Sequence, residues 1–179
     1  RAKQVGQELP VPKNPAERIA QSYSLPVWLA SKFIEWQGKN EAESIAQASN
    51  KAPTFDLRVN RLRSNPIALK QEFASKGIAS SLIDSSPDGL CLESGVGDVQ
   101  NLPGFDEGKW CVQDRSSQWV APLLDPQPGD RVLDACAAPG SKTTYLAELM
   151  NNQGEIWAVD RSPKRLQRVV VNASRLGCD

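Results

Sequence analysis

Hydrophobic positions change their spacing along this chain, and the changes mark out its elements. In the segment SLPVWLASKFIEWQG, Leu29, Phe33 and Trp36 recur at helical spacing, and Gly38 stands where the helix would end. We expect Trp28 and Trp36 to pack inward, because aromatic side chains on a helix usually do. Asn-x-x-Glu sequences before and after this segment are typical of helix starts, so short helices should surround it.

The next stretch, APTFDLRVNRLR, alternates with a period of two and is expected to be a strand. One face of this strand would carry the apolar side chains of Phe55, Leu57 and Val59. The other face would carry the polar side chains of Asp56, Arg58 and Asn60. A helix that Asn65 and Pro66 open and Gly77 closes should follow, and then two short strands. WCVQDRSSQWVAPLL is predicted to be a brief strand and then a helix capped by Asp114. This order of elements indicates a small α+β module.

After the turn DPQPGD the pattern changes to strands that alternate with helices. RVLDAC and EIWAVD are short apolar runs that suit buried parallel strands, and SKTTYLAELM lies between them as a helix. A second helix runs from Ser162 to Gly177. A β-α-β-α order predicts a parallel sheet wound as in nucleotide- and cofactor-binding folds, which is a Rossmann-like α/β domain.

The charged and chemically reactive residues narrow the possible functions. The chain carries 21 basic and 21 acidic side chains and no histidine, which excludes a Ser-His-Asp or Cys-His nucleophile and a histidine-bearing metal site within it. The four cysteines are spaced too widely for a CxxC element, so we expect reduced thiols and no metal. Residues 1–70 hold 11 basic and 6 acidic side chains, whereas residues 71–130 hold 3 and 10. Any nucleic-acid surface should therefore be local and lie in the first segment.

The sequence also bears on the location of the protein. No apolar run approaches the roughly 18 residues that suggest a membrane span, and the polar start lacks the apolar core of a secretory signal. We therefore expect a cytoplasmic protein with no membrane partner, and we expect no oligomer.

The first strand-to-helix turn of the α/β segment has the composition of a ligand loop. In an open α/β sheet the ligand binds beyond the carboxyl ends of the strands, and this turn approaches it most closely. Small residues at Ala137, Ala138 and Gly140 would let backbone amides approach a ligand, and the helix N-terminus that follows offers N–H groups to an anionic group. Asp160, at the end of the second strand, is placed to accept hydrogen bonds from ribose hydroxyls. Together these features predict a nucleoside-bearing cofactor.

The residues of this turn argue against two common cofactors. A phosphate-binding loop needs Gly-x-x-x-x-Gly-Lys-Ser/Thr, but Cys136 and Ser141 occupy the two glycine positions before Lys142, which argues against ATP. A dinucleotide-binding fingerprint needs three glycines, and only Gly140 is present, which argues against NAD.

VLDACAAPGSKTTYLAELM and GEIWAVDRSPKRLQRVVVNASRLG resemble the first two motifs of the Sun/Fmu-type RNA (cytosine carbon-5) methyltransferases, whose cofactor loop reads DxCAAPGGKT. SLPVWLASKF, APTFDLRVNRLR, LPGF and VQDRSSQ resemble the segments that precede the catalytic domain in the bacterial 16S ribosomal RNA branch of that family. The resemblance implies the start of a Rossmann-like S-adenosylmethionine methyltransferase domain at residues 126–179. Before it would come a helical and α+β RNA-binding module at 22–125 and, at 1–21, a linker or tail of an upstream helical NusB-like domain.

The resemblance also implies roles for individual residues. Those that would bind S-adenosylmethionine are Cys136, Ala137, Ala138, Pro139, Gly140, Ser141, Lys142, Asp160 and Arg165. Asp160 would hold the ribose, while Asp134 would either brace the loop or contact the ligand. Ser141 replaces the family's second glycine, and we expect its hydroxyl to cap the helix. Arg58, Arg61 and Arg63 would either contact RNA phosphates or form a solvated strand edge.

In this family a cysteine thiolate adds to carbon 6 of cytosine, so that carbon 5 can attack the sulfonium methyl group. The resemblance places the attacking cysteine and its partner in Pro-Cys and Thr-Cys motifs, which do not occur in these residues, so Cys136 is not expected to be the nucleophile. We expect a fragment of an enzyme that methylates carbon 5 of cytosine in ribosomal RNA. It should be inactive alone and should leave a sheet edge and apolar faces uncovered. The alternative hypothesis is a noncatalytic RNA-binding module with a structural Rossmann-like cap.

Overall fold

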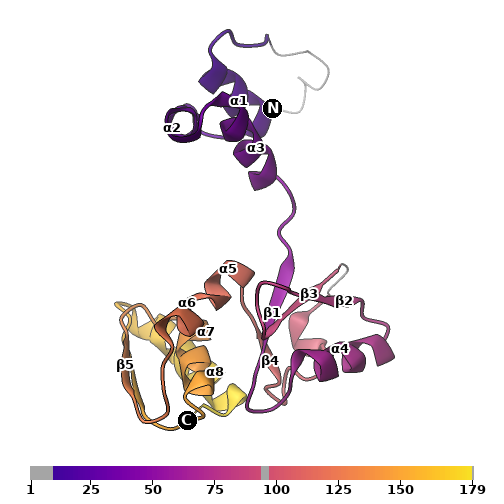
Figure 1. Ribbon diagram of the computed structural model, residues 1–179, viewed down its shortest axis with the longest axis vertical. Helices are drawn as coiled ribbons and strands as arrows, with labels where there is room; N and C mark the ends of the chain where they lie inside the picture. The colour runs from indigo at the N-terminus through magenta and orange to yellow at the C-terminus, as the bar shows by residue number, and fades with distance from the viewer. Residues whose placement is uncertain (1–9, 94–96, 179) are drawn as a thin grey trace. The chain divides into compact units, whose positions relative to one another are not determined.

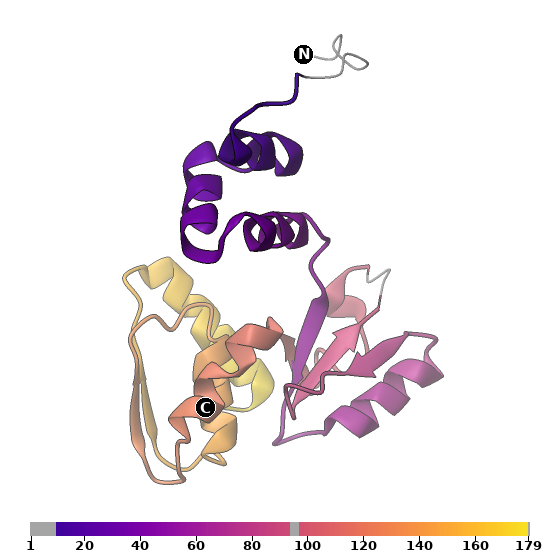
Figure 2. The ribbon, with the colours of Figure 1, turned by 45° about the horizontal axis from the view of Figure 1, so that its top comes forward.

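The structure of the protein is a computed structural model that describes residues 10–93 and 97–178. The chain divides into two compact units, one ending at Pro53 and the other beginning at Thr54 (Figures 1 and 2). Within the described residues, no helix combines the length and the apolar character that crossing a membrane would require.

The first unit is a group of three helices around a core of small side chains. The helices are α1 (Pro15–Tyr23), α2 (Val27–Gln37) and α3 (Lys39–Ser49). Asn14 caps α1 as expected, its side chain accepting a hydrogen bond from the N–H of Ala16 at 2.8 Å. The buried core consists of Ala16, Ile19, Ala20, Ala30, Ala42 and Ala46.

The prediction that Trp28 and Trp36 pack inward is wrong. Their exposed fractions are 67% and 62%, whereas Ala30 of the same helix is fully buried. The core between the three helices is built mainly of alanines, and both tryptophans lie on the exposed side of α2. Leu29 and Phe33, which share the predicted apolar stripe, are half-buried.

The second unit begins with a four-stranded antiparallel sheet in the order β2-β3-β1-β4. Its elements are β1 (Phe55–Val59), α4 (Pro66–Ser75), β2 (Ser80–Leu82), β3 (Gly89–Leu92), η1 (Val99–Asn101) and β4 (Trp110–Val112). Helix α4 packs on one face of the sheet, and the shared core consists of Leu57, Val59, Leu69, Phe73, Leu90, Leu92 and Trp110. The predicted α+β module is therefore present, and the apolar side of the alternating stretch faces its core.

Two strand-helix units follow the antiparallel sheet. Their elements are α5 (Arg115–Gln118), α6 (Val120–Leu124), β5 (Arg131–Asp134), α7 (Ser141–Leu149), β6 (Glu155–Ala158) and α8 (Pro163–Leu176). Strands β5 and β6 are parallel and in register from Arg131 opposite Glu155 to Asp134 opposite Ala158. This arrangement confirms the predicted Rossmann-like β-α-β-α order.

Helix α7 lies between the parallel pair and the antiparallel sheet (Figures 1 and 2). On the other face of the parallel pair, Leu133, Trp157 and Val159 are 63%, 56% and 48% exposed. Among the described residues, β6 pairs with no strand other than β5. The sheet thus has the uncovered edge and apolar face that the sequence predicts.

Candidate functional site

The loop of residues 136–142 follows β5 and includes the first two residues of α7, and hydrogen bonds fix its start to the neighbouring strand. The N–H of Val159 donates to the carbonyl of Asp134 at 2.9 Å, and the N–H of Ala137 donates to the carbonyl of Val159 at the same distance. These two bonds continue the parallel ladder past the end of both strands. The loop therefore starts in a defined position beside the residue that ends the second strand.

Asp160 and the loop are in direct contact. One carboxylate oxygen of Asp160 accepts from the N–H of Ala138 at 3.2 Å, and the other accepts from the N–H of Ser162 at 3.0 Å. The Ser162 N–H, and then that of Ala138, hold the pKa of Asp160 below its ordinary value against the effect of burial. The carboxylate is therefore ionised at neutral pH and faces the loop, as the sequence predicts.

Helix α8 reaches back to the carbonyl groups of the loop through two side chains. Arg165 donates to the carbonyl of Ala138 at 3.1 Å and lies 3.9 Å from the carboxylate of Asp160. Asn172 donates to the carbonyl of Pro139 at 2.8 Å. The sequence predicts Arg165 near the loop but does not single out Asn172. The sequence does contain one indication of the role of Asn172: it lies seven residues after Arg165, and this spacing places both residues on one face of a helix.

Gly140, the residue directly before α7, has a backbone conformation that favours glycine. Its φ is +108°, and a Cβ atom at this position would lie 3.0 Å from the Cα of Val169 in α8. The absence of a side chain at Gly140 therefore allows α8 to pack this close to the loop. The neighbouring Ala137 and Ala138 are also buried.

The expectation that Ser141 caps α7 is wrong. Ser141 is already the first helical residue, the N-cap position belongs to Gly140, and no described side chain makes a capping hydrogen bond there. The first N–H groups of α7 are consequently without a side-chain acceptor and are available to an anionic group. Lys142 is half-buried in this first turn.

Asp134 stabilises the loop through hydrogen bonds at both of its ends. One of its carboxylate oxygens accepts from the N–H of Cys136 at 3.3 Å, and the other accepts from the hydroxyl of Thr143 at 2.7 Å. Of the two roles predicted for Asp134, the structure shows the bracing role. Cys136 itself is exposed.

The three predicted RNA-contacting arginines have different environments. Arg58 is fully buried and donates to Ser141, Thr144 and Glu148 of α7, so the prediction that it contacts RNA phosphates or lies at a solvated edge is wrong. The alternating pattern showed that Arg58 lies opposite the apolar face, but that opposite face packs against α7. Arg61, at 52% side-chain exposure, and Arg63 are exposed and keep the predicted access to solvent.

The remaining cysteines are not suited to nucleophilic chemistry. Burial raises the pKa of Cys91, Cys111 and Cys178, in the case of Cys178 to about 12. These thiols are therefore protonated at neutral pH, and a protonated thiol is a poor nucleophile. The described residues contain no group of three or more side chains that could hold a metal ion.

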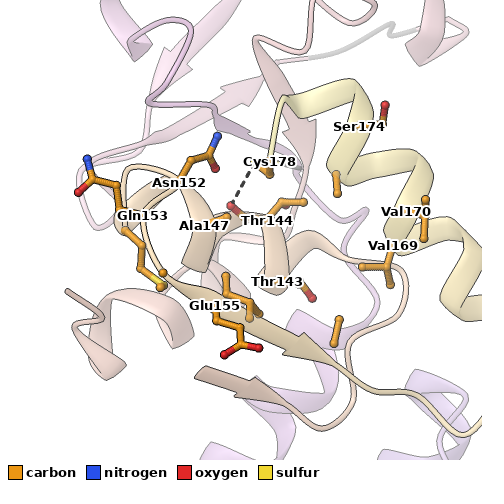
Figure 3. A pocket seen from close by; sticks show the side chains of 15 residues that line it. Thr143, Thr144, Ala147, Asn152, Gln153, Glu155, Val169, Val170, Ser174 and Cys178 are labelled. Carbon is orange, nitrogen blue, oxygen red and sulfur yellow. Dashed lines mark hydrogen bonds between the residues drawn. The ribbon is translucent and has the colours of Figure 1, made fainter. Parts of the chain in front are cut away.

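A pocket of about 630 Å³ lies between α7, β6 and α8 (Figure 3). Thr144 and Ala147 line it from α7, and Val169 and Ser174 line it from α8. The thiol of Cys178 donates to the carbonyl of Thr144 at 3.8 Å at one end of this space (Figure 3). Of the described residues that line the pocket, none belongs to the loop of residues 136–142. The pocket therefore adjoins the loop through Thr143 and Val169 but is not lined by the loop itself.

Glu148 of α7 pairs with Arg58 at 2.8 Å, and both side chains are fully buried. Burial raises the pKa of Glu148 to about 7, although the Arg58 guanidinium opposes this effect. Between pH 4.5 and 7 the folded protein therefore binds more protons at this position than the unfolded chain does. The resulting contribution to stability is present below pH 4.5 and is lost as the pH rises through 7.

We expect this titration to distinguish the wild type from Glu148→Gln, which cannot titrate. The free energy of unfolding of the wild type, relative to that of the variant, should fall by on the order of 1 kcal/mol per pH unit between pH 5 and 7. Urea unfolding at half-unit pH intervals measures this difference. A difference that stays constant, or that grows in favour of the wild type as the pH rises, would contradict the assigned direction.

Two family models match the sequence. One, described as 16S rRNA methyltransferase RsmB/F, matches residues 121–179, and the other, described as a Methyltr_RsmF/B-like, ferredoxin-like domain, matches residues 25–100. The first match contains the loop of residues 136–142 and Asp160. The second contains the larger part of the antiparallel sheet.

The chain is also similar to curated proteins along most of its length. It is 44% identical, over 89% of its residues, to the "Probable ribosomal RNA small subunit methyltransferase B" of Synechocystis sp., and it spans 36% of that protein. It is 40% identical over its whole length to the "Ribosomal RNA small subunit methyltransferase B" of Pseudomonas putida and spans 40% of it. The chain thus covers somewhat more than a third of the length of these relatives.

Solved structures share the fold. A methyltransferase homolog protein from Pyrococcus horikoshii is 32% identical to the chain, with a TM-score of 0.83, and the match covers 94% of this chain and 55% of that one. NSun6 from the same organism, solved with SFG, matches 86% of this chain and 63% of its own with a TM-score of 0.79. At 20% identity, the likeness to NSun6 shows the fold alone.

Proposed function

Since this chain belongs to the family of the RsmB/F 16S rRNA methyltransferases, we propose that it takes part in the S-adenosylmethionine-dependent methylation of carbon 5 of a cytosine in ribosomal RNA. The observation that carries this proposal is the direct contact between Asp160 and the loop of residues 136–142. Through this contact, the loop of small residues and the carboxylate beyond the second strand lie side by side. Both features are typical of sites for a nucleoside-bearing cofactor.

The residues of this site fit S-adenosylmethionine. The cofactor would supply a methyl group bound to a sulfonium centre, and its carboxylate would suit the N–H groups at the start of α7, which lack a side-chain cap among the described residues. Each carboxylate oxygen of Asp160 accepts one N–H bond, so lone pairs remain for ribose hydroxyls. The set that would surround the cofactor is Cys136, Ala137, Ala138, Pro139, Gly140, Ser141, Lys142, Asp160 and Arg165.

For the other parts of the chain, we propose that residues 22–125 include the RNA-binding module and that residues 126–179 are the start of the methyltransferase domain. The predicted boundary at residue 21 falls inside α1 (Pro15–Tyr23), which packs with α2 and α3, so the part proposed as a linker or tail is limited to the residues before α1. The two exposed arginines that follow β1, Arg61 and Arg63, are proposed to contact RNA phosphates. Their exposure and their position outside the buried face of the sheet support this role.

Residues 1–179 alone are not expected to transfer a methyl group. They contain neither a Pro-Cys nor a Thr-Cys sequence, and burial keeps Cys91, Cys111 and Cys178 protonated. The alternative function, a noncatalytic RNA-binding module, predicts that the chain binds RNA but not the cofactor.

Calorimetric titration with S-adenosylmethionine tests the cofactor site. We expect the wild type to bind and Asp160→Asn to bind about tenfold more weakly, because a hydrogen bond to a charged group contributes roughly 1.5–3 kcal/mol. Glu155→Gln is a matched control, because Glu155 is an exposed carboxylate at the opposite end of the same strand. Equal affinities in all three proteins would refute the role of Asp160. RNA binding with no cofactor binding in the wild type would favour the alternative function.

A further inference from the structure

The polar side chains of β1 and of Asn60, which directly follows the strand, are buried, and each of the three contacts a different helix. Asp56 accepts two hydrogen bonds from the guanidinium of Arg115 in α5, at 2.7 and 2.8 Å. Arg58 donates to α7, and Asn60 donates to the last residue of α8. The exposed fractions of Asp56, Arg58 and Asn60 are 3%, 0% and 0%. This face of the antiparallel sheet is therefore an internal interface and not a surface for RNA.

Arg58 connects β1 to the point where the loop of residues 136–142 becomes helix α7. Its guanidinium donates to the carbonyl of Ser141 at 2.9 Å, to the hydroxyl of Thr144 at 3.1 Å and to the carboxylate of Glu148 at 2.8 Å. The hydroxyl of Thr144 in turn donates to the carbonyl of Gly140, at 2.9 Å. Two successive hydrogen bonds thus run from the sheet to Gly140, the single glycine of the loop.

Asn60 acts on the other helix that contacts the loop. Its side-chain amide donates to the carbonyls of Leu176 and Gly108, each at 2.8 Å, and so fixes the end of α8 to the turn before β4. The earlier turns of α8 carry Arg165 and Asn172, which donate to the carbonyls of the loop. The loop is consequently held from both sides by helices that β1 fixes in place.

We propose that Arg58 and Asn60 are positioning residues for the loop of residues 136–142, and that the affinity of the chain for S-adenosylmethionine depends on them although neither contacts the loop's ligand side. This inference rests on the proposed function only for the identity of the ligand. The placement of the loop itself is a property of the chain without ligand. Asp56, on the same strand, accepts hydrogen bonds from Arg115 of α5, and none of its described hydrogen bonds reaches the loop, α7 or α8, so it is excluded from this role.

The test compares four variants of the 179-residue chain. Arg58→Lys keeps the charge but loses the forked set of donors, Thr144→Val removes the hydroxyl between Arg58 and Gly140 at nearly constant volume, and Asn60→Ala removes the bonds to α8. Asp56→Asn is the matched control, because it weakens an ion pair of the same strand away from the loop. Hydrogen exchange of the loop amides and calorimetric titration with S-adenosylmethionine are measured on each.

We expect loop-amide exchange about tenfold faster and cofactor binding about tenfold weaker in the first three variants, on the scale of other supporting contacts around a bound group. The amides of β1 and β3 should remain protected, and Asp56→Asn should match the wild type at the loop. If Arg58→Lys does not fold, Thr144→Val carries the same test. Unchanged loop exchange in Thr144→Val and Asn60→Ala would overturn the proposal. Faster loop exchange in a chain that binds no S-adenosylmethionine would support positioning and refute the proposed cofactor.

Discussion

Replacing Arg58 by methionine is expected to lower the free energy of unfolding of the second unit by about 3–5 kcal/mol at pH 8. The substitution leaves Glu148 fully buried and without its counter-ion, because the 2.8 Å ion pair is lost. The cost should be smaller at pH 6, since the pKa of Glu148 is raised to about 7 and the carboxyl group can then take up a proton. Urea unfolding monitored by hydrogen exchange of the β1 and β3 amides, which lie in the second unit, measures both values.

The double variant Arg58→Met with Glu148→Leu separates the charge from the packing. The Nε of Arg58 and one carboxylate oxygen of Glu148 have no hydrogen-bond partner among the described residues, so the pair is incompletely satisfied. We therefore expect the double variant to be more stable than Arg58→Met alone. Arg131→Met is the control, because the ion pair of Arg131 with Glu155 is exposed and should contribute less than about 1 kcal/mol. Equal losses in Arg58→Met and Arg131→Met would refute the prediction.

The second large effect is expected for Gly140→Ala, which should destabilise the second unit by about 2–4 kcal/mol and abolish measurable cofactor binding. The backbone at φ +108° disfavours a side chain, which costs about 1–3 kcal/mol, and the new Cβ would lie 3.0 Å from the Cα of Val169. To relieve this contact α8 must move away from the loop, and Arg165 moves with it. Thermal unfolding with and without S-adenosylmethionine measures both effects.

Gly129→Ala is the matched control for this substitution. Gly129 has a similar φ of +96°, but a Cβ atom there would meet nothing within 4 Å. It should therefore show the backbone cost without the contact with α8. Equal destabilisation in the two variants would mean that the close approach of α8 to the loop has no energetic consequence.

The sequence predicts the α/β part of the fold well, for a clear physical reason. Buried parallel strands are short apolar runs, and the carboxyl ends of two such strands must lie at the same edge of the sheet. This rule places Asp160 beside the loop without any knowledge of side-chain contacts. The rule does not single out Asn172: the seven-residue spacing puts Asn172 on the same face of α8 as Arg165, but that this face turns toward the loop follows only from the structure.

The polar face of β1 shows where the reasoning from sequence ends. A period of two establishes that Asp56, Arg58 and Asn60 lie on one side of the strand, but it does not show what covers that side. Polar residues on a strand usually face water, and here they face three helices. The error for Trp28 and Trp36 has the same cause: the helical spacing identifies a face, whereas the alanines of neighbouring helices determine which face is buried.

The interface on β1 also limits how this protein can be divided or recombined. A chain cut at the turn DPQPGD would lack α7 and α8. The guanidinium of Arg58 and the side-chain amide of Asn60 would then face water in place of these helices. An exchange of parts between relatives would therefore have to transplant residues 54–179 together, even though a boundary drawn from sequence falls in the middle of that stretch. The antiparallel sheet and the two strand-helix units should consequently unfold in a single thermal transition, and recombination between relatives should keep them together.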